Sequence, residues 1–289
     1  MKFEENLSKI NKIIFKVAQP VLKSVLKLKN IHQGESCYII GDGISIKWFD
    51  LSIFSNKPVI SLNKIAYHKQ SSYLNLKYTT FTEPYYFYPY YWDPDPGMVE
   101  TTGKQIFKNY VQKKFKELIK KQRNTTFFVN LSNYPTLWDP NICWVYKMIN
   151  DPNSKFLQEC NYSNLNIYAG SFRCAVALAV YMGFSEIFLV GCDYTHEKPK
   201  AQRWYEKGAG ILKNFPEYEK DFLNIARKYA NITTITLEGG GTHLPGQTYY
   251  QFSGKEPKFR ENIDLMEKSM LDTLSKEPWY SNRKYNRIY

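Results

Sequence analysis

Short apolar runs followed by small or polar residues recur along this chain and predict the strands of a sheet. They fall at residues 36–40, 59–62, 78–81, 126–129, 187–190 and 232–237. A four-residue run such as 187–190 suits a parallel strand that is buried on both faces. Between the runs lie helical patterns and loops, so the chain is predicted to alternate strands and helices in βαβ units.

The clearest unit begins at Gly170-Ser171 and ends at Asp193. The two small residues predict a helix start at which the serine hydroxyl caps free backbone N–H groups. Three alanines let this helix lie close to a sheet, and Gly183 ends it. Asp193 then follows the strand 187–190 at its carboxyl end, which is the edge where open α/β sheets bind ligands. A helix N-terminus and a carboxylate at one edge predict a site for an anionic, polyhydroxylated ligand.

The ends of the other predicted strands carry similar residues. The strand 36–40 runs into Gly41-Asp42-Gly43-Ile44-Ser45, where paired glycines allow a sharp turn and a close approach to a ligand. This turn lacks the GxGxxG spacing of dinucleotide-binding folds and the lysine of a P-loop. The recurrence of polar strand ends predicts one binding site built from Gly41, Asp42, Gly43, Ser45, Asn63, Glu83, Ser132, Asn133, Gly170, Ser171 and Asp193.

These elements predict an α/β fold with a Rossmann-like, mostly parallel sheet flanked by helices. The chain of 289 residues is long enough for one such catalytic domain with a lid insertion. We expect a basic amphipathic helix at 1–30, the Rossmann-like domain at 31–250, and a C-terminal helix with a basic tail at 251–289. Further helices are expected at 104–121 and 217–229, and loops at 84–97 and at the glycine-bearing lid, 195–215.

The formal net charge of +12 calls for an anionic partner. No RNP-like or zinc-finger pattern organises the basic residues, so nucleic acid is not the expected partner. Residues 2–29 carry seven lysines beside apolar positions that recur every three or four residues, and Pro20 should kink this helix. Such a helix either binds a membrane surface or packs on the body of the protein or on another subunit.

Compartment and assembly follow from simpler features. The five cysteines are scattered without CxxC pairs, which predicts neither a zinc site nor a disulfide framework and favours a reducing compartment. No signal peptide or membrane-spanning run is visible. We therefore expect a cytoplasmic protein, peripheral on the inner face of the cytoplasmic membrane, with a homo-oligomer left open.

From about Tyr38 to Leu237 these segments resemble the bacterial family-42 sialyltransferases. The same helix–strand unit is similar to the domain of archaeal 6-hydroxymethylpterin diphosphokinase and flagellar Maf-type proteins. The turn after Ile40 resembles that family's G-N-G-P-S donor loop, Asn63 falls at the spacing of an asparagine that contacts the nucleotide, and Leu131-Ser132-Asn133-Tyr134 matches its SNY stretch. Ser171 resembles a helix-capping serine near the donor, and Gly191–Tyr194 matches G-x-D-[FY].

The chain departs from this family at several positions. Asp42 and Glu83 stand where the sialyltransferases carry asparagines, and an extra carboxylate near a donor phosphate is unfavourable without a compensating partner. The family's catalytic histidine lies in the lid, where this chain has none at 212–215. His196 and His243 follow strand ends at the expected ligand edge and are the candidate substitutes. The lid tyrosines that steady the leaving phosphate would be Tyr194 and Tyr205.

The resemblance implies an inverting, metal-independent glycosyltransferase. It would move an acidic sugar (sialic acid, a related nonulosonate or Kdo) from a CMP donor to a bacterial surface glycan or glycolipid, with no cofactor besides the donor. Three other functions stay open from the sequence. The first is a Mg²⁺-dependent diphosphotransferase of the hydroxymethylpterin-kinase type, in which Asp42, Glu83 and Asp193 would hold the metal. The second is a non-catalytic nucleotide-binding protein of glycan assembly. The third is a nucleic-acid binder.

Overall fold

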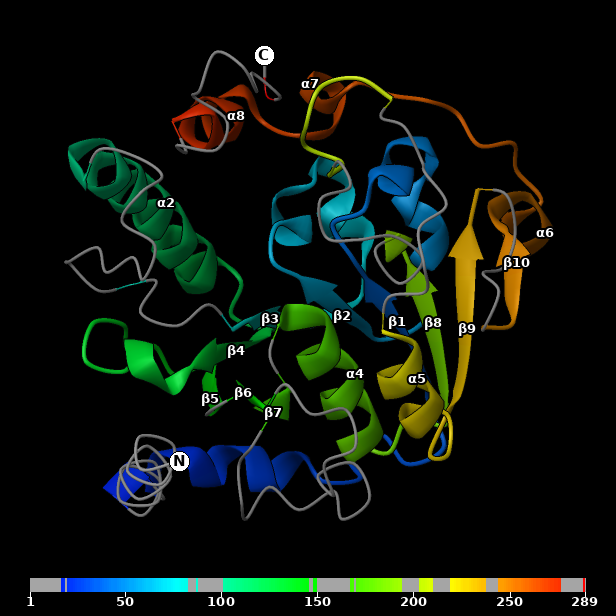
Figure 1. Ribbon diagram of the computed structural model, residues 1–289, viewed down its shortest axis with the longest axis horizontal. Coiled ribbons are helices and arrows are strands. Elements are labelled where there is room, and N and C mark those ends of the chain that lie inside the picture. Colours follow the sequence, from blue (N-terminus) through cyan, green and yellow to red (C-terminus); the bar gives the residue numbers. More distant parts are fainter. Residues whose placement is uncertain are drawn as a thin grey trace.

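The computed structural model describes residues 17–18, 20–82, 87, 101–145, 148–149, 167–168, 170–193, 203–209, 219–237, 244–276 and 288. Eight strands of this part form one sheet in the order β10-β9-β8-β1-β2-β3-β4-β5, and all neighbouring pairs are parallel (Figure 1). Their bounds are β1 Ser36–Ile40, β2 Val59–Leu62, β3 Leu76–Phe81, β4 Thr126–Asn130, β5 Ile142–Val145, β8 Glu186–Val190, β9 Asn231–Thr236 and β10 Gly246–Thr248. A separate parallel pair joins β6 Met148–Ile149 to β7 Ile167–Tyr168. The predicted Rossmann-like α/β fold is confirmed.

The strand order places a topological switch point between β1 and β8. From β1 the sheet grows through β2, β3, β4 and β5 in one direction, and the chain later returns to add β8, β9 and β10 on the other side of β1. The strand order reverses at such a point and leaves a crevice outside the carboxyl ends of the strands, where ligands of open α/β sheets bind. A binding site is therefore expected at the turns after β1 and β8.

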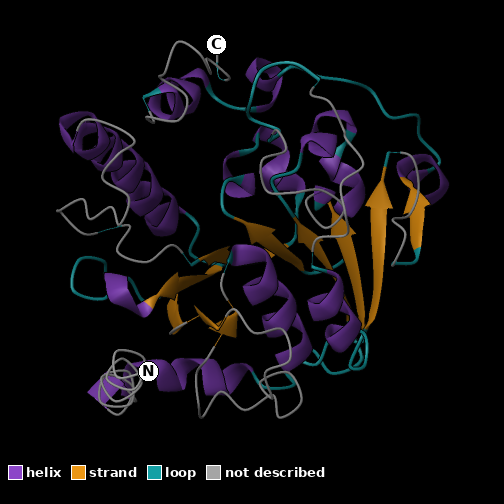
Figure 2. Cartoon of the chain, in the orientation of Figure 1, coloured by secondary structure: helices purple, strands orange, loops and turns teal. Residues whose placement is uncertain are grey.

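Helices cover both faces of the sheet (Figure 2). Two apolar clusters lie on opposite faces, because alternate residues of β1 enter different clusters: Cys37 and Ile39 one, Tyr38 and Ile40 the other. The α-helices of the described part are α2 Thr101–Lys121, α4 Ser171–Tyr181, α5 Lys220–Ala226, α6 Tyr249–Ser253, α7 Asn262–Leu265 and α8 Lys268–Ser275. The described part also contains short 3-10 helices, namely η1 Lys23–Leu28, η2 Ile44–Trp48, η3 Leu51–Phe54, η4 Ile65–Tyr67, η5 Lys69–Tyr73 and η6 Leu131–Asn133.

The sheet extends beyond its predicted ends. The run 232–237 was expected to be the last strand, but β10 follows it and pairs with β9 in parallel. At the opposite edge, β5 adds a strand beside β4. The prediction of the last strand was wrong because β10 is a three-residue polar segment without the apolar pattern of a buried strand.

The described part of the N-terminal segment packs on the body of the protein. Leu22 and Val25 are fully buried, and the Ser24 hydroxyl lies 3.5 Å from the thiol of Cys143 in β5. Val17, expected on the apolar face of the N-terminal helix, is instead 77% exposed to solvent, and Leu26 is 47% exposed. The expected packing on the body therefore holds for this part of the segment, which leaves Leu26 and nearby lysines facing solvent. Residues 1–16 lie outside the described part of the chain.

A buried lysine ties the first crossover to the C-terminal region. The Lys47 side chain in η2 is fully buried, and its Nζ donates to Glu261 Oε1 at 2.8 Å and to the carbonyl of Gly208 at 2.6 Å. Glu261 Oε1 also accepts from the Gly208 amide at 2.8 Å. Burial lowers the pKa of Lys47, and the Glu261 carboxylate works against this effect. One ion pair thus holds three separate segments together.

We expect Glu261→Gln to lower the free energy of unfolding by about 2 kcal/mol, because it leaves the buried Lys47 ammonium without a charged partner. Urea unfolding at neutral pH measures the change. Glu256→Gln, at an exposed glutamate in the same segment, is the matched control and should stay within about 0.5 kcal/mol of the wild type. Equal stability of the two variants would contradict the assigned role of the pair.

Candidate functional site

The turns after β1 and β8 touch each other at the switch point. The Gly41 amide donates to the Val190 carbonyl at 2.8 Å, and the Gly43 amide donates to the Gly191 carbonyl at 2.7 Å. A Cβ atom at Gly43 would collide with the Asp193 carboxylate, and one at Gly41 with the Gly191 carbonyl. The paired glycines are therefore needed for contact between two turns of the protein itself, which is a different use from the predicted approach to a ligand.

Asp193 points into this junction. Its Oδ2 accepts from the Ser45 amide at 2.8 Å, and its side chain is buried. Burial raises the pKa of Asp193, while its hydrogen bonds with Ser45 oppose the shift. Asp193 therefore connects the carboxyl end of β8 to η2, directly after the glycine turn.

Asp42 holds the described segment 203–209, the central part of the predicted lid. Its Oδ1 accepts from the indole Nε1 of Trp204 at 3.2 Å, and its backbone carbonyl accepts from the Trp204 amide at 3.2 Å. An antiparallel bridge joins Gly43 to Arg203 beside these bonds. Burial raises the pKa of Asp42, against the opposing charges of Lys64 and Arg203. The protein thus offsets part of the cost of burying this carboxylate.

Asn63 and Ser171 meet at the same edge. The Ser171 hydroxyl donates to Asn63 Oδ1 at 2.8 Å and lies 3.4 Å from the Thr82 hydroxyl. The predicted capping by Ser171 was wrong: Gly170 is the N-cap, with φ of 88°, and makes no side-chain cap bond. This left-handed backbone is open to glycine, so the helix begins at Ser171, one residue earlier than a Ser171 cap would place it, and the serine turns towards Asn63 at the end of β2. The N-terminus of α4 is consequently joined to the end of β2.

The SNY segment after β4 is used partly within the protein. Asn133 is fully buried; its Oδ1 accepts from the Phe87 amide at 2.7 Å, and its Nδ2 donates to the Asn130 carbonyl at 3.2 Å. The Ser132 amide donates to Asn130 Oδ1 at 3.0 Å. These bonds shape the turn after β4, and a role of Ser132 or Asn133 in donor binding stays a prediction.

Tyr205 lies inside segment 203–209. It is fully buried, and its hydroxyl accepts from Arg203 Nη1 at 2.7 Å. Its predicted contact with a leaving phosphate stays a prediction, because the described hydroxyl faces an arginine of its own segment. Glu83, Tyr194, His196 and His243 lie outside the described residues.

Two histidines belong to the described part of the chain, and neither replaces the predicted bases. His32 precedes β1, at the opposite edge of the sheet, and bonds the Tyr78 hydroxyl at 2.7 Å. His68 is buried beside Trp204, with ring centroids 5.0 Å apart. Burial lowers the pKa of His68 to about 3, so its ring is neutral near pH 7. The candidate general bases therefore remain His196 and His243.

Sequence reasoning missed Lys64, Arg203 and the particular role of Trp204. Lys64 follows Asn63 directly, so its position next to a polar strand end could have identified it as a candidate site residue from the sequence. Trp204 and Arg203 contact Asp42 and Gly43, about 160 residues away in the chain, and no local pattern predicts these contacts. The hydrogen bonds described above join site residues from β1, β2, β8 and α4, whereas Ser132 and Asn133 shape the separate turn after β4.

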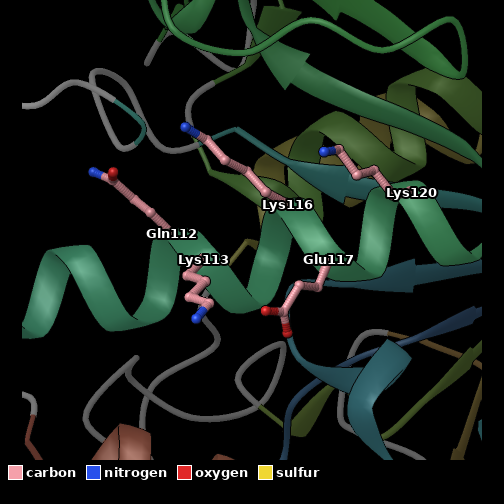
Figure 3. Close-up of a pocket in the computed structure, with 5 residues that line it drawn as sticks. All are labelled: Gln112, Lys113, Lys116, Glu117 and Lys120. Carbon is pink, nitrogen blue, oxygen red and sulfur yellow. The ribbon is translucent and has the colours of Figure 1, made fainter.

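A pocket of about 310 Å³ lies elsewhere, along the basic helix α2 (Figure 3). Lys116 and Lys120 project from one side of the helix there, and Lys113 and Glu117 project from another. The remaining lining residue is Gln112. Part of the positive charge of the chain therefore gathers at a surface that includes none of the predicted site residues. Among the described residues, no group of three His, Cys, Asp or Glu side chains is placed to hold a metal ion.

Comparisons with known proteins show similarity to a solved structure, while neither the family models nor the curated proteins match. Among solved structures, the sialyltransferase CstII from Campylobacter jejuni, in complex with the substrate analogue cytidine-5'-monophosphate, matches with a TM-score of 0.43 and 16% sequence identity. The match covers 85% of this chain and 99% of that one.

We expect the stability of Asp193→Asn relative to the wild type to rise with pH. The raised pKa makes the folded Asp193 carboxyl bind a proton more readily than the unfolded one, so the wild type loses stability as pH rises above the unfolded value of about 4. Asparagine does not titrate, so the stability of Asp193→Asn relative to the wild type should increase steadily as the pH rises above about 4.

Urea unfolding at several pH values measures this difference. Asp221→Asn, at an exposed aspartate of α5, is the control and should show a smaller pH-dependent difference. A difference for Asp193→Asn that is constant with pH would contradict the assignment.

Proposed function

We propose that this protein is an inverting glycosyltransferase. It would transfer an acidic sugar of the sialic acid, related nonulosonate or Kdo type from a CMP donor to a bacterial surface glycan. The observation that carries the proposal is the bond from Ser171 to Asn63, which joins the N-terminus of α4 to the end of β2 beside the switch point. The order of the sequence motifs that resemble family-42 sialyltransferases supports the same function.

The proposed donor site combines polar groups suited to a nucleoside monophosphate. Asn63 Oδ1 is used by Ser171, which leaves its Nδ2 as a donor without a partner among the described residues. The first amides of a helix lack intrahelical partners and favour anions, so the start of α4 suits a phosphate. Asp42 is engaged by Trp204 and Lys64, and we assign it to holding segment 203–209 rather than to the ribose.

The proposed reaction passes through an oxocarbenium-like state as the bond from the sugar to the CMP phosphate breaks. The acceptor hydroxyl loses its proton to an imidazole, for which His196 and His243 are the candidates. Both follow strands that are neighbours in the sheet, β8 and β9. N–H and O–H donors near Ser171 would stabilise the charge that grows on the leaving phosphate.

A Mg²⁺-dependent diphosphotransferase has less support. It needs carboxylate oxygens directed at a metal ion, whereas Asp42 accepts from Trp204 and Asp193 accepts from the Ser45 amide. Carboxylates engaged by N–H donors in this way are poorly placed to act as metal ligands. We therefore keep the glycosyltransferase as the single proposed function.

Peripheral attachment to an anionic membrane surface is the second part of the proposal. Lys23 and Lys27 are exposed on η1, next to the exposed side chain of Leu26. A basic surface with an apolar side chain suits anionic lipid headgroups. An acceptor carried on a lipid would then lie close to the enzyme. None of the described helices is both long and apolar enough to cross a bilayer.

We expect CMP to raise the melting temperature of the wild type more than ATP does. The variants Ser171→Ala and Asn63→Gly should each bind CMP about tenfold more weakly, because each variant loses about one hydrogen bond. Glycine is chosen at Asn63 because φ is 42° there. Thermal shift and calorimetric titration provide the measurements. Ser185→Ala, at the opposite edge of the sheet, should bind CMP like the wild type. The donor assignment is wrong if cytidine nucleotides cause no shift in the wild type.

We expect the double variant Lys23→Gln/Lys27→Gln to bind anionic liposomes about thirtyfold more weakly, since each lysine near an anionic surface contributes about 1 kcal/mol. Substitution is preferred to deletion of the segment, because Leu22 and Val25 belong to the core. Lys116→Gln/Lys120→Gln on α2 carries the same charge change and is the control. Co-sedimentation measures binding, and equal losses in the two double variants would reject a specific membrane role of η1.

A further inference from the structure

Lys64 presents a positive charge at the edge where the predicted site residues meet. Its Nζ lies 5.1 Å from the centroid of the Tyr205 ring, at the distance of a cation–π contact. No described residue accepts a hydrogen bond from this ammonium or forms an ion pair with it, and the side chain is half-buried. A cation in this position is available to a ligand.

Hydrogen bonds hold the backbone at Lys64 and at the preceding residue, Asn63. Its amide points to Asp42 Oδ2 at 3.5 Å, and the preceding Asn63 accepts the bond from Ser171 at 2.8 Å. The Asn63 amide donates to the Thr80 carbonyl at 3.2 Å. Lys64 therefore leaves the sheet immediately beside the start of α4, and its position is set by β2, β3 and the glycine turn together.

The surface under the ammonium is equally well held. Tyr205 is fully buried, its hydroxyl accepts from Arg203, and its carbonyl accepts from Asn262 Nδ2 at 3.0 Å. An aromatic ring supports a cation without neutralising its charge, unlike a carboxylate. The Lys64 ammonium can therefore keep its place and still interact with an external anion.

The nearby Asp42 is already used. Its carboxylate accepts from Trp204 and lies close enough to Lys64 and Arg203 for both charges to influence it. One buried carboxylate thus faces two cations, of which Lys64 makes no ion pair with a described residue. An oxyanion bound at Lys64 would give this ammonium the ion pair that it lacks among the described residues.

We propose that Lys64 binds the acidic group of the substrate, an oxyanion that lies beside Asn63 and Ser171. The identity of the substrate rests on the proposed function. In a CMP-activated acidic sugar the oxyanion is either the nucleotide phosphate or the carboxylate of the sugar. In both cases Lys64 is a binding residue that discriminates charged from neutral ligands, and its removal weakens binding through the loss of a charge-assisted hydrogen bond.

The test is calorimetric titration of Lys64→Gln with cytidine, CMP and CMP-sialic acid. If Lys64 binds the phosphate, CMP binds at least about tenfold more weakly than to the wild type, and cytidine binds equally well. If it binds the carboxylate, CMP is unaffected and CMP-sialic acid is weakened by at least about tenfold. Lys64→Arg keeps the charge and should restore most of the affinity in either case.

Lys77→Gln, an exposed lysine near the start of β3, makes the same change at the opposite edge of the sheet and should leave all three affinities unchanged. The proposal is overturned if Lys64→Gln binds all three ligands like the wild type, or if cytidine affinity falls as far as CMP affinity. If the wild type binds no cytidine ligand, the proposed function fails by itself. Titration with inorganic pyrophosphate then tests whether Lys64 binds an oxyanion. Loss of pyrophosphate binding in Lys64→Gln supports this role of Lys64, and binding equal to that of the wild type overturns it.

Discussion

Contact between the turns after β1 and β8 is the constraint on which the rest of this site depends. Two backbone bonds join the turns, from Gly41 to Val190 and from Gly43 to Gly191. A side chain at position 43 would occupy the space of the Asp193 carboxylate. Because the two strands flank the switch point of the sheet, this contact fixes the relative positions of the groups that border the candidate site.

Asp42 shows how a residue that looks unfavourable in the sequence is accommodated. A buried carboxylate beside an anionic ligand is costly unless the protein compensates its charge. Here the indole of Trp204 and the amide of Lys64 point to its oxygens, and the charges of Lys64 and Arg203 act on it. The carboxylate thereby organises the segment 203–209.

The sequence predicted the buried strands and the residues that end them, because apolar runs and glycine turns are local signals. It did not predict β10, which is short and polar, or the use of Ser171 as a partner of Asn63 instead of a cap. That bond spans 108 positions of the chain, and the cap depends on the left-handed backbone of Gly170. Likewise, no sequence pattern near Lys64 predicts its contact with the ring of Tyr205. Such long-range pairings are set by tertiary packing.

Asn63 combines a backbone requirement with a chemical one. Its φ of 42° lies in the left-handed region, which asparagine, aspartate and glycine occupy with the least strain. Of these three, asparagine alone offers both an acceptor for the Ser171 hydroxyl and an N–H donor on the same side chain. Few substitutions would therefore preserve both properties: aspartate would keep the turn but replace the N–H donor with a negative charge, and glycine would keep only the turn. Other residues would strain the loop that carries Lys64.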